Sequence, residues 1–259
     1  MDRRITLEIK NIRKESKSVK TFTFSYNLNA KPGQFIMLTD FECGEKPFSI
    51  SDCTDNEFSI TVKKIGEFTT RLFQLKKGDV LSFRGPYGSS FSLSDKVLLI
   101  GGGYAVPPLL FLSKMLKKYN ADITIINGAK TKEDILFIEN FKRITDKVFF
   151  TTDDGSLGNK GTVMSIVSPL LQNEKFDMIY ASGPEPMLKK IVDMCDTIPC
   201  EVLIERYMKC AIGICGQCVI DSLGIIICKE GPVLDKEVVK RLSEFGVYKR
   251  NASGKRVYF

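Results

Sequence analysis

The chain has 259 residues, with 38 lysines and arginines against 31 acidic residues, so its formal net charge is +7. It has eight cysteines and no histidine, which excludes a Ser-His-Asp triad, a Rieske centre, a His-ligated haem and a mixed His/Cys zinc site. The basic residues are scattered and form no block with interleaved aromatics, which argues against nucleic-acid binding. The N-terminus lacks the apolar segment of a signal peptide, and no apolar run could span a bilayer. We therefore expect a cytoplasmic protein without a membrane or nucleic-acid partner.

Residues 1–94 are predicted to form an antiparallel β-barrel. Short segments of alternating or β-rich composition are separated by turns that contain glycine or proline. These segments are residues 5–14, 20–26, 33–40, 58–65 and 79–88. Helical spacing appears only briefly, over residues 69–75. Many short strands with regular turns are typical of a small closed barrel.

Residues 95–204 show a different pattern, in which strands alternate with helices. The predicted strands are 96–103, 121–128, 147–155, 176–183 and 200–206, and the predicted helices are 107–119, 132–144, 161–171 and 184–195. Alternation of this kind indicates a parallel, doubly wound sheet. Residues 205–259 are rich in loops and cysteine, and they end in a basic stretch.

Four cysteines are concentrated in the last of these regions. Cys210, Cys215 and Cys218 have the spacing C-x₄-C-x₂-C, and Cys228 follows after nine residues. This is the plant-type ferredoxin spacing, in which four thiolates hold a [2Fe–2S] cluster. Gly213 lies in the loop, where glycine permits the tight bends that such a loop needs. A Cys₄ zinc site is the alternative, although zinc sites more often use two separated C-x₂-C pairs.

Several short motifs precede the cysteines. "KVLLIGGGYAVPPL" reads as a strand, a glycine turn and a helix start, where a backbone can approach a pyrophosphate. "KPFSIS", "KKIGEFTTRL" and "RGPYGSSF" place small or hydroxyl residues beside a cation or a glycine, as a flavin and its diphosphate would require. Each motif is weak evidence when taken alone.

In this order, together with "GPEPML", "ER-x-M-x-C-x-x-G-x-C-x-x-C" and "CKEGPV", the motifs resemble the ferredoxin-reductase superfamily along essentially the whole chain. The chain is most similar to the iron–sulfur electron-transfer subunits of two-subunit, NAD-dependent dihydroorotate dehydrogenases. The resemblance implies a flavin-binding barrel over residues 1–94, a nucleotide domain over 95–204 and a small [2Fe–2S] domain with the C-terminal stretch over 205–259.

The resemblance also implies roles for individual residues. FAD would contact Lys46, Pro47, Phe48, Ser49, Thr61, Val62, Lys63, Gly66, Phe68 and Thr69, with Ser49 near the isoalloxazine and the last three at a helix start beneath the diphosphate. NAD would be framed by Gly101, Gly102, Gly103, Gly183 and Pro184, and the cluster would be held by Cys210, Cys215, Cys218 and Cys228.

The chain departs from the family pattern at two of these positions and at two others. The family usually has arginine where Lys46 stands, and lysine cannot form a bidentate pair of hydrogen bonds with a phosphate. Many members have glycine where Phe68 and Ala105 stand and cysteine where Ser182 stands. Ala105 and Ser182 are expected where the nicotinamide docks. Lys130 could meet a 2′-phosphate, which leaves NADP open.

The function that the resemblance implies is electron transfer in pyrimidine biosynthesis, as the flavin and iron–sulfur subunit of an oxidoreductase. Electrons would pass from the FMN of a dihydroorotate dehydrogenase catalytic subunit through the cluster and FAD to NAD, within a heterotetramer of two subunits of each kind. The sequence offers no general base for oxidising dihydroorotate, so that step is assigned to the partner. Two alternatives stay open: the electron-transfer subunit of a sulfite-reductase or hydrogenase type of complex, and a non-enzymatic zinc protein.

Overall fold

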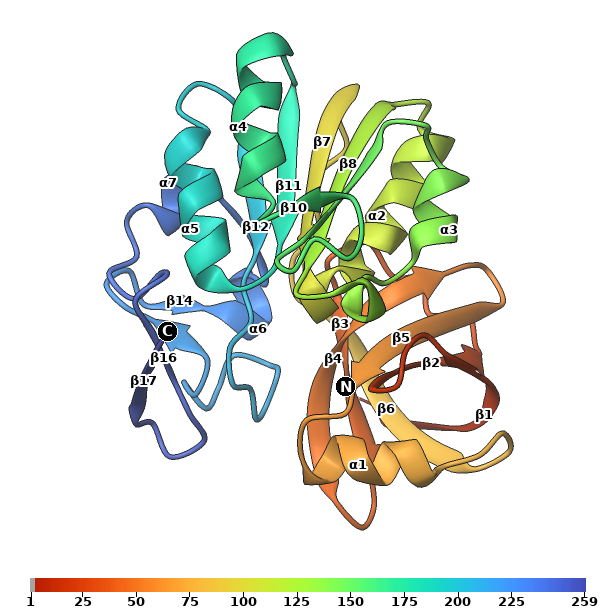
Figure 1. The fold of residues 1–259 in the computed structure, drawn as a ribbon. Helices are drawn as coiled ribbons and strands as arrows, with labels where there is room; N and C mark the ends of the chain where they lie inside the picture. Colours follow the sequence, from red (N-terminus) through yellow and green to blue (C-terminus); the bar gives the residue numbers. More distant parts are fainter. Residues whose placement is uncertain (1–2) are drawn as a thin grey trace.

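The computed structural model describes residues 3–259, which form a barrel, a larger sheet with helices on both faces, and a C-terminal region packed beside both (Figure 1). The closed barrel has the strand order β1-β2-β5-β4-β3-β6, and every pairing in it is antiparallel. Its strands are β1 (Ile5–Lys14), β2 (Val19–Ser25), β3 (Phe35–Asp40), β4 (Gly44–Cys53), β5 (Glu57–Lys63) and β6 (Val80–Tyr87), and one helix, α1 (Glu67–Gln74), follows β5. The barrel prediction is confirmed.

Along β2 and β5, side chains alternate between the apolar core of the barrel and its outer face. Phe22 and Phe24 of β2 and Ile60 and Val62 of β5 are buried in one apolar cluster. Their neighbours Thr21 and Thr23 pair with Thr61 and Ser59 through hydroxyl hydrogen bonds at 2.9 Å. One face of each strand therefore builds the core, and the other presents hydroxyl groups outside it.

The second sheet has seven strands in the order β10-β9-β8-β7-β11-β12-β15, of which only β15 is antiparallel to its neighbour. The chain starts in the middle with β7, builds β8 and β9 on one side, and then returns to build β11 and β12 on the other side. The strands are β7 (Lys96–Gly102), β8 (Asp122–Ala129), β9 (Val148–Thr152), β10 (Asn159–Lys160), β11 (Met178–Ser182), β12 (Cys200–Leu203) and β15 (Val233–Asp235). The strand order reverses between β7 and β11, which is where open sheets of this kind bind ligands.

Helices cover both faces of this sheet. Leu98 and Ile100 of β7 pack in a cluster with α4 (Met164–Asn173) and α5 (Glu185–Met194). The alternate residues Val97 and Leu99 pack in a second cluster with α2 (Pro107–Lys118) and α3 (Ile138–Lys142). A central strand that is apolar on both faces explains the continuous hydrophobic run in the sequence. Two short 3₁₀ turns also occur, η1 (Gly103–Ala105) and η2 (Lys132–Asp134).

The predicted helix over residues 132–144 is wrong in extent, because only η2 and the five-residue α3 form there. Phe137 adopts a left-handed conformation with φ = 63°, which interrupts a helix. The backbone carbonyl of the preceding residue, Leu136, accepts a hydrogen bond from the buried side-chain amide of Asn127 at 2.9 Å. Burial of this loop against the sheet thus overrides the helical spacing of its apolar residues.

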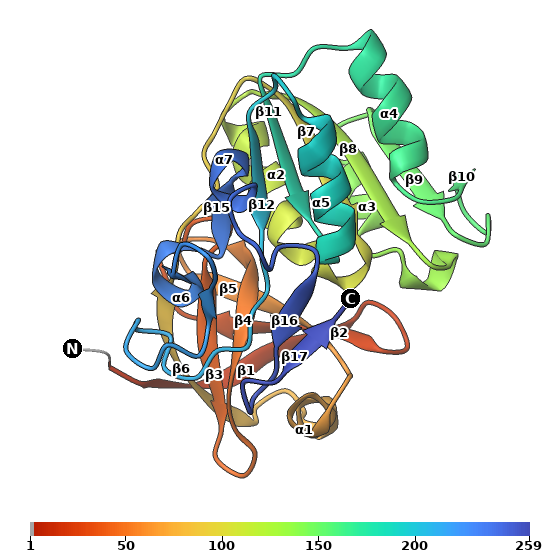
Figure 2. The ribbon, with the colours of Figure 1, turned by 90° about the vertical axis from the view of Figure 1, so that its left-hand side faces the viewer.

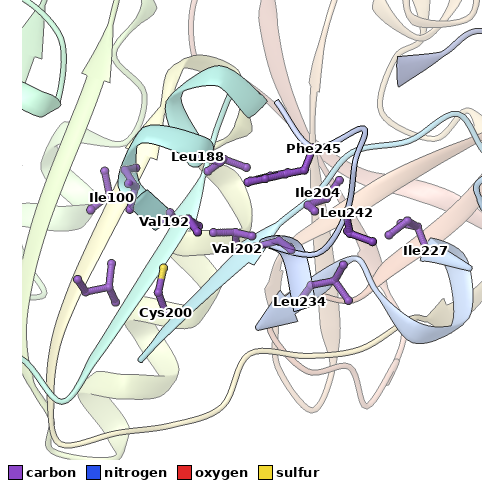
Figure 3. Packing of buried hydrophobic residues seen from close by; sticks show 14 of the residues in the cluster. Ile100, Leu188, Val192, Cys200, Val202, Ile204, Ile227, Leu234, Leu242 and Phe245 are labelled. Carbon is purple, nitrogen blue, oxygen red and sulfur yellow. The ribbon is translucent and has the colours of Figure 1, made fainter. Parts of the chain in front are cut away.

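The C-terminal region shares a core with the sheet (Figure 3). Ile227, Leu242 and Phe245 pack in the same cluster as Leu188 of α5 and Val202 of β12. The region contains β13 (Val219–Ile220), β14 (Ile225–Ile226), α6 (Ile227–Glu230), α7 (Lys236–Val239), β16 (Tyr248–Arg250) and β17 (Arg256–Tyr258). Figure 2 shows α6 and the β16–β17 hairpin in front of the barrel, and α7 beside α5. The basic stretch at the end of the sequence forms the β16–β17 hairpin.

Candidate functional site

A cavity of about 220 Å³ lies where the barrel meets the end of β12. Its residues therefore come from strand ends that are distant in sequence. One wall holds seven of the ten residues that the resemblance assigns to FAD: Pro47, Phe48, Ser49, Thr61, Val62, Lys63 and Thr69. The opposite wall is formed by the chain leaving β12, with Leu203, Ile204, Glu205, Arg206 and Met208. We call this space the flavin cavity.

The other three assigned residues stand beside the cavity rather than in its lining. Gly66 caps the N-terminus of α1, where Thr69 Oγ1 accepts hydrogen bonds from the N–H groups of Ile65 (2.9 Å) and Gly66 (3.0 Å). Phe68 is buried and stacks on Phe48 with ring centroids 5.9 Å apart. Lys46 Nζ lies 5.3 Å from the centre of the Tyr207 ring.

The residues present fit a flavin dinucleotide. Apolar walls from Phe48 and Val62 suit a flat ring, and the hydroxyl groups of Ser49 and Thr61 can orient it. The N-terminus of the eight-residue helix α1 lies beside them and offers backbone N–H groups to a phosphate.

A larger cavity of about 530 Å³ lies at the C-terminal ends of β7 and β11. Gly102, Gly103, Gly183 and Pro184 line it, as the resemblance implies. A Cβ on Gly183 would lie 2.3 Å from Met187 Cε and 3.2 Å from the Cα of Gly102. The two glycine turns therefore touch each other at the reversal of strand order, and a side chain at Gly183 would separate them. We call this space the nucleotide cleft.

Gly101 has a different role, since it does not line the cleft. A Cβ at this position would lie 2.5 Å from Val106 Cγ2, so the glycine lets the start of α2 pack against β7. Ser182 is buried, and its Oγ donates a hydrogen bond to the carbonyl of Ala105 at 2.6 Å. This bond fixes two of the four residues at which the chain departs from the family pattern.

The sequence interpretation missed several residues of the cleft. Thr151 and Asp153 lie at the end of β9, so the ends of parallel strands were a usable signal. Lys130, which the sequence had indicated as a possible contact of a 2′-phosphate, follows β8 and lines the cleft. Lys249 and Phe259 come from the β16–β17 hairpin and its end. No local motif indicated these two residues, because only the packing of the C-terminal region brings them to the cleft.

Four residues line both the flavin cavity and the nucleotide cleft: Lys63, Tyr104, Ala105 and Glu205. We call this set the junction. Glu205 is exposed as a residue, and partial desolvation of its carboxylate raises its pKa, while the charge of Lys249 partly offsets the effect. Desolvation also raises the pKa of Tyr104, and the charge of Glu205 adds to this shift.

A buried ion pair connects the walls of the two spaces. Arg206 in the flavin-cavity wall donates to both carboxylate oxygens of Glu185 in the nucleotide cleft, with Nη2–Oε2 at 3.1 Å. Glu185 Oε2 also accepts a hydrogen bond from the N–H of Gly246 at 3.1 Å, just before the C-terminal hairpin. Burial lowers the pKa of Arg206 to about 10, so the guanidinium remains charged at neutral pH.

The four cysteines of the C-terminal region lie in two pairs. The N–H of Cys215 points to the sulfur of Cys210 at 3.5 Å, and the N–H of Cys228 points to the sulfur of Cys218 at 3.4 Å. Cys215 is exposed, whereas Cys218 and Cys228 are buried. The connecting loop turns tightly, with positive φ at Ala211, Gly213 and Gly216.

This arrangement fits a binuclear cluster better than a single zinc ion. In a [2Fe–2S] cluster each iron takes two of the four thiolates, so two adjacent pairs satisfy it. A zinc site needs four ligands around one point, whereas the contacts among these cysteines run within the two pairs. Backbone N–H groups directed at the sulfurs also suit thiolate ligands.

The cysteine loop is fastened to the barrel. Arg84 of β6 donates from Nη1 to the carbonyl of Cys210 at 2.8 Å. The same guanidinium forms a bidentate pair with Glu45 of β4, at 2.9 and 2.6 Å. The flavin cavity and the cysteine loop therefore share their supporting strands.

Comparison with family models gives two matches. Residues 6–91 match the oxidoreductase FAD-binding domain, and residues 205–240 match the iron–sulfur cluster binding domain of dihydroorotate dehydrogenase B. These matches cover the barrel and the cysteine loop. No helix within residues 3–259 has both the length and the apolar character needed to cross a membrane.

Known proteins resemble the chain over its whole length. A probable dihydroorotate dehydrogenase B (NAD(+)) electron transfer subunit from Methanocaldococcus jannaschii is 44% identical and covers 100% of both chains. One from Methanothermobacter thermautotrophicus is 41% identical over 97% of this chain and 96% of that protein. Among solved structures, a chain of the NADH-dependent reduced ferredoxin-NADP oxidoreductase superposes with a TM-score of 0.81 at 30% identity, covering 92% of this chain and 93% of that one.

Proposed function

Because this chain belongs to the family of electron transfer subunits of NAD-dependent dihydroorotate dehydrogenase B, we propose that it carries electrons from a dihydroorotate-oxidising catalytic subunit to NAD. The chain takes part in an oxidoreductase of pyrimidine biosynthesis and contains FAD-binding and iron–sulfur domains. When bound, FAD exchanges single electrons with an iron–sulfur cluster and electron pairs with a nicotinamide.

The observation that carries this proposal is the order of the three sites in space. The flavin cavity shares the four junction residues with the nucleotide cleft. Its lining also includes Met208, two residues before Cys210. A flavin in this cavity would therefore lie between the cluster and the nucleotide, which is the order that electron transfer to NAD requires.

We assign roles to the chain's own residues on the same basis. Lys46 neutralises a flavin phosphate, and Ser49 and Thr61 orient the ring through their hydroxyl groups. Gly102 and Gly183 let the backbone approach the nucleotide, because both turns are too close for side chains. Cys210 with Cys215, and Cys218 with Cys228, hold the two irons.

The partner is proposed to be an FMN-containing catalytic subunit, in a complex of two subunits of each kind. Support comes from the exposed side of the cysteine loop. Cys215 is exposed, and the neighbouring Ile212 and Ile214 present large apolar side chains to solvent. Exposed apolar residues around a redox centre suit a protein interface at which electrons must cross a short distance.

The test compares the chain alone with the reconstituted complex. The purified chain is expected to contain FAD and two irons and to oxidise NADH with an artificial dye, but to show no activity on dihydroorotate. Reduction of NAD⁺ by dihydroorotate should appear only after the catalytic subunit is added. Full dihydroorotate activity from the chain alone would contradict the division of labour. If electrons passed only to a sulfite reductase or hydrogenase partner, the assigned partner would be wrong.

A further inference from the structure

A third cavity, of about 470 Å³, lies between the outer face of the barrel and the helices α2 and α3. Two hydroxyl pairs of β2 and β5 line it, Thr21 with Thr61 and Thr23 with Ser59. Among residues 3–259, only Thr61 is shared with the flavin cavity, and no lining residue is shared with the nucleotide cleft. We call this space the hydroxyl cavity.

The strands on either side of these pairs are irregular where they meet the cavity. In the barrel β1 adjoins β2 and β4 adjoins β5, and the register of each pairing shifts by one residue at this point. Two successive side chains of each strand therefore line the cavity, Lys10 with Asn11 and Ser51 with Asp52. Such bulges re-aim side chains and are over-represented beside active sites. The backbone thus brings polar groups of both strands into the same space.

One hydroxyl group in the cavity wall has no partner in the protein. Ser51 is 2% exposed, and within residues 3–259 its Oγ is buried without a hydrogen bond. The preceding residue, Ile50, is buried in the barrel core, so Ser51 faces the outer side of its strand, where the cavity lies. A buried hydroxyl without a partner costs free energy, because its hydrogen bonds to water have been lost. A ligand in the hydroxyl cavity would supply the missing bond.

Basic residues outnumber acidic ones around these hydroxyl groups. Four basic and two acidic residues line the cavity: Lys10, Arg13, Lys77, Lys114, Asp52 and Glu57. Both acids are already paired, Glu57 with Lys10 at 2.6 Å and Asp52 with Lys114 at 2.5 Å, and Arg13 pairs with Glu15 outside the lining.

Lys77 is the cation left over. In the part of the chain that the structure describes, residues 3–259, it forms no ion pair. The N–H of Gly78 donates to the carbonyl of Ile9 at 2.9 Å, so Lys77 and Lys10 lie at the same end of the cavity. This end therefore carries positive charge that an anionic ligand would neutralise.

We propose that the hydroxyl cavity binds a phosphorylated sugar, either free or within a nucleoside monophosphate. The phosphate, which carries about −1.5 to −2 charge at neutral pH, lies beside Lys77. The sugar hydroxyls bond Ser51 and the Thr23–Ser59 pair, because a hydroxyl group both donates and accepts, as these groups do. Leu110 and Phe137 are buried at the helix side and form an apolar wall. This site goes beyond the proposed function, which does not use it.

The first test measures the affinity of the FAD- and cluster-loaded chain for ribose 5-phosphate by titration calorimetry. Ser51→Ala should weaken binding about two- to ten-fold, the factor for one hydrogen bond. The same change should leave the stability in urea equal to or above that of the wild type, because no hydrogen bond of the free protein is lost. A loss of stability would show that Ser51 has a structural partner and would overturn its assignment to a ligand.

Ser82→Ala is the matched control for this test. Ser82 is fully buried in β6, shares a hydrogen bond with Thr6 at 2.6 Å and does not line the cavity. Its replacement should lower the stability and leave the affinity for ribose 5-phosphate unchanged, which is the opposite of the result expected for Ser51→Ala.

A second pair of variants tests the charge. Lys77→Ala should weaken binding of ribose 5-phosphate about two- to five-fold, the range for an exposed ionic contact. Lys76→Ala removes the neighbouring exposed lysine, which does not line the cavity, and should leave binding unchanged. Equal affinities for the wild type, Ser51→Ala and Lys77→Ala would overturn the proposal.

Two further titrations identify the ligand and its place. Tighter binding of uridine 5′-monophosphate than of ribose 5-phosphate would identify a nucleotide whose base meets Leu110 and Phe137, whereas equal affinity would identify a free sugar phosphate. Absence of binding by either compound, or displacement of both by NAD⁺, would overturn the site. Failure of NADH to reduce the flavin would contradict the proposed function alone, because these titrations require no electron transfer.

Discussion

The four cysteines of the loop are held in unequal environments. Burial alone would raise the pKa of Cys210, but N–H groups of Cys215, Ile212 and Ile214 lower it to about 6. Burial and the neighbouring Cys218 raise the pKa of Cys228 to about 12. Cys210 is therefore the more readily ionised of the two thiols, whereas Cys228 would lose its proton only with the help of a nearby positive charge such as a bound metal.

Replacing Cys215 with serine tests the ligand assignment. Cys215→Ser should abolish the visible absorbance of the cluster and leave FAD bound, because the cysteine loop and the flavin cavity are built from different residues. Iron, acid-labile sulfide and flavin are measured on protein purified without oxygen. Cys43→Ser is the control, since Cys43 is a free thiol in the barrel. Unchanged cluster stoichiometry in Cys215→Ser would show that another residue is the ligand.

Lys46 provides a test of the flavin assignment. Lys46→Ala should weaken FAD binding by roughly 1.5–3 kcal/mol, the range for a hydrogen bond to a charged group. The affinity of the apoprotein for FAD is measured by fluorescence titration. Lys77→Ala removes an exposed barrel lysine that does not line the flavin cavity, and it should leave the affinity unchanged. Equal affinities for the wild type and Lys46→Ala would mean that Lys46 is only a surface residue.

At the scale of elements, β4 and β6 are joined to the cysteine loop by one charged contact. Glu45 of β4 pairs with Arg84 of β6, and Arg84 holds the carbonyl of Cys210. Burial would raise the pKa of Glu45, but hydrogen bonds from Arg84 and Thr39 and the charge of Arg84 lower it below the ordinary value of 4.5. The ionised carboxylate therefore stabilises the folded state, and with it the attachment of the loop to the barrel.

The lowered pKa of Glu45 predicts a pH dependence of stability. A group whose pKa is lower in the folded state than in the unfolded state stabilises the protein at pH values above the unfolded pKa. This stabilisation is lost as the pH falls through the folded pKa. Glu45→Gln should therefore be less stable than the wild type at pH 7, and the difference in free energy of unfolding should shrink below about pH 4.5. Urea unfolding at several pH values measures this difference.

The matched variant for this test is Glu133→Gln, which alters an exposed carboxylate of η2. Its stability relative to the wild type should not follow the pH profile of Glu45→Gln. A difference for Glu45→Gln that stays constant from pH 7 to pH 4 would contradict a stabilising Glu45–Arg84 pair.

At the scale of the whole molecule, the three sites are arranged around one packed centre. The cluster region lies against the barrel through Arg84 and against α5 through Glu185. Its core residues continue the core of the larger sheet (Figure 3). The cysteine loop is consequently fixed relative to the flavin cavity on one side, while its exposed apolar side chains are free to meet a partner.

The proposed docking surface is tested at Ile214, which is 79% exposed beside Cys215. Ile214→Asp should weaken binding to the catalytic subunit about five-fold or more, because an anchor at the centre of an interface typically contributes more than about 1 kcal/mol. Phe41→Asp is the control, as Phe41 is 71% exposed on the β3–β4 turn. Affinity is measured by titration with FAD and iron contents checked. If Ile214→Asp and Phe41→Asp weakened binding of the catalytic subunit equally, the interface would not be centred on Ile214.

The sequence by itself determined the fold class and the family. Alternating residues in 5–14 and 58–65 predict barrel strands, and the alternation of strands with helices over 95–204 predicts a parallel sheet, because both patterns reflect local geometry and burial. The spacing of Cys210, Cys215, Cys218 and Cys228 predicts the cluster, since a short loop must place its ligands by chain length alone. The helix predicted over 132–144 was wrong, because burial of Phe137 is a tertiary effect.

Only the tertiary structure decided how the sites meet. Gly102 and Gly183 are 81 residues apart in sequence, yet their turns touch because β7 and β11 are neighbours in the sheet. The junction joins residues from β5, η1 and the end of β12, and the hairpin residues Lys249 and Phe259 reach the nucleotide cleft. Such proximities depend on which strands become neighbours and on how the barrel, the larger sheet and the C-terminal region pack, and no local pattern of residue types encodes that arrangement.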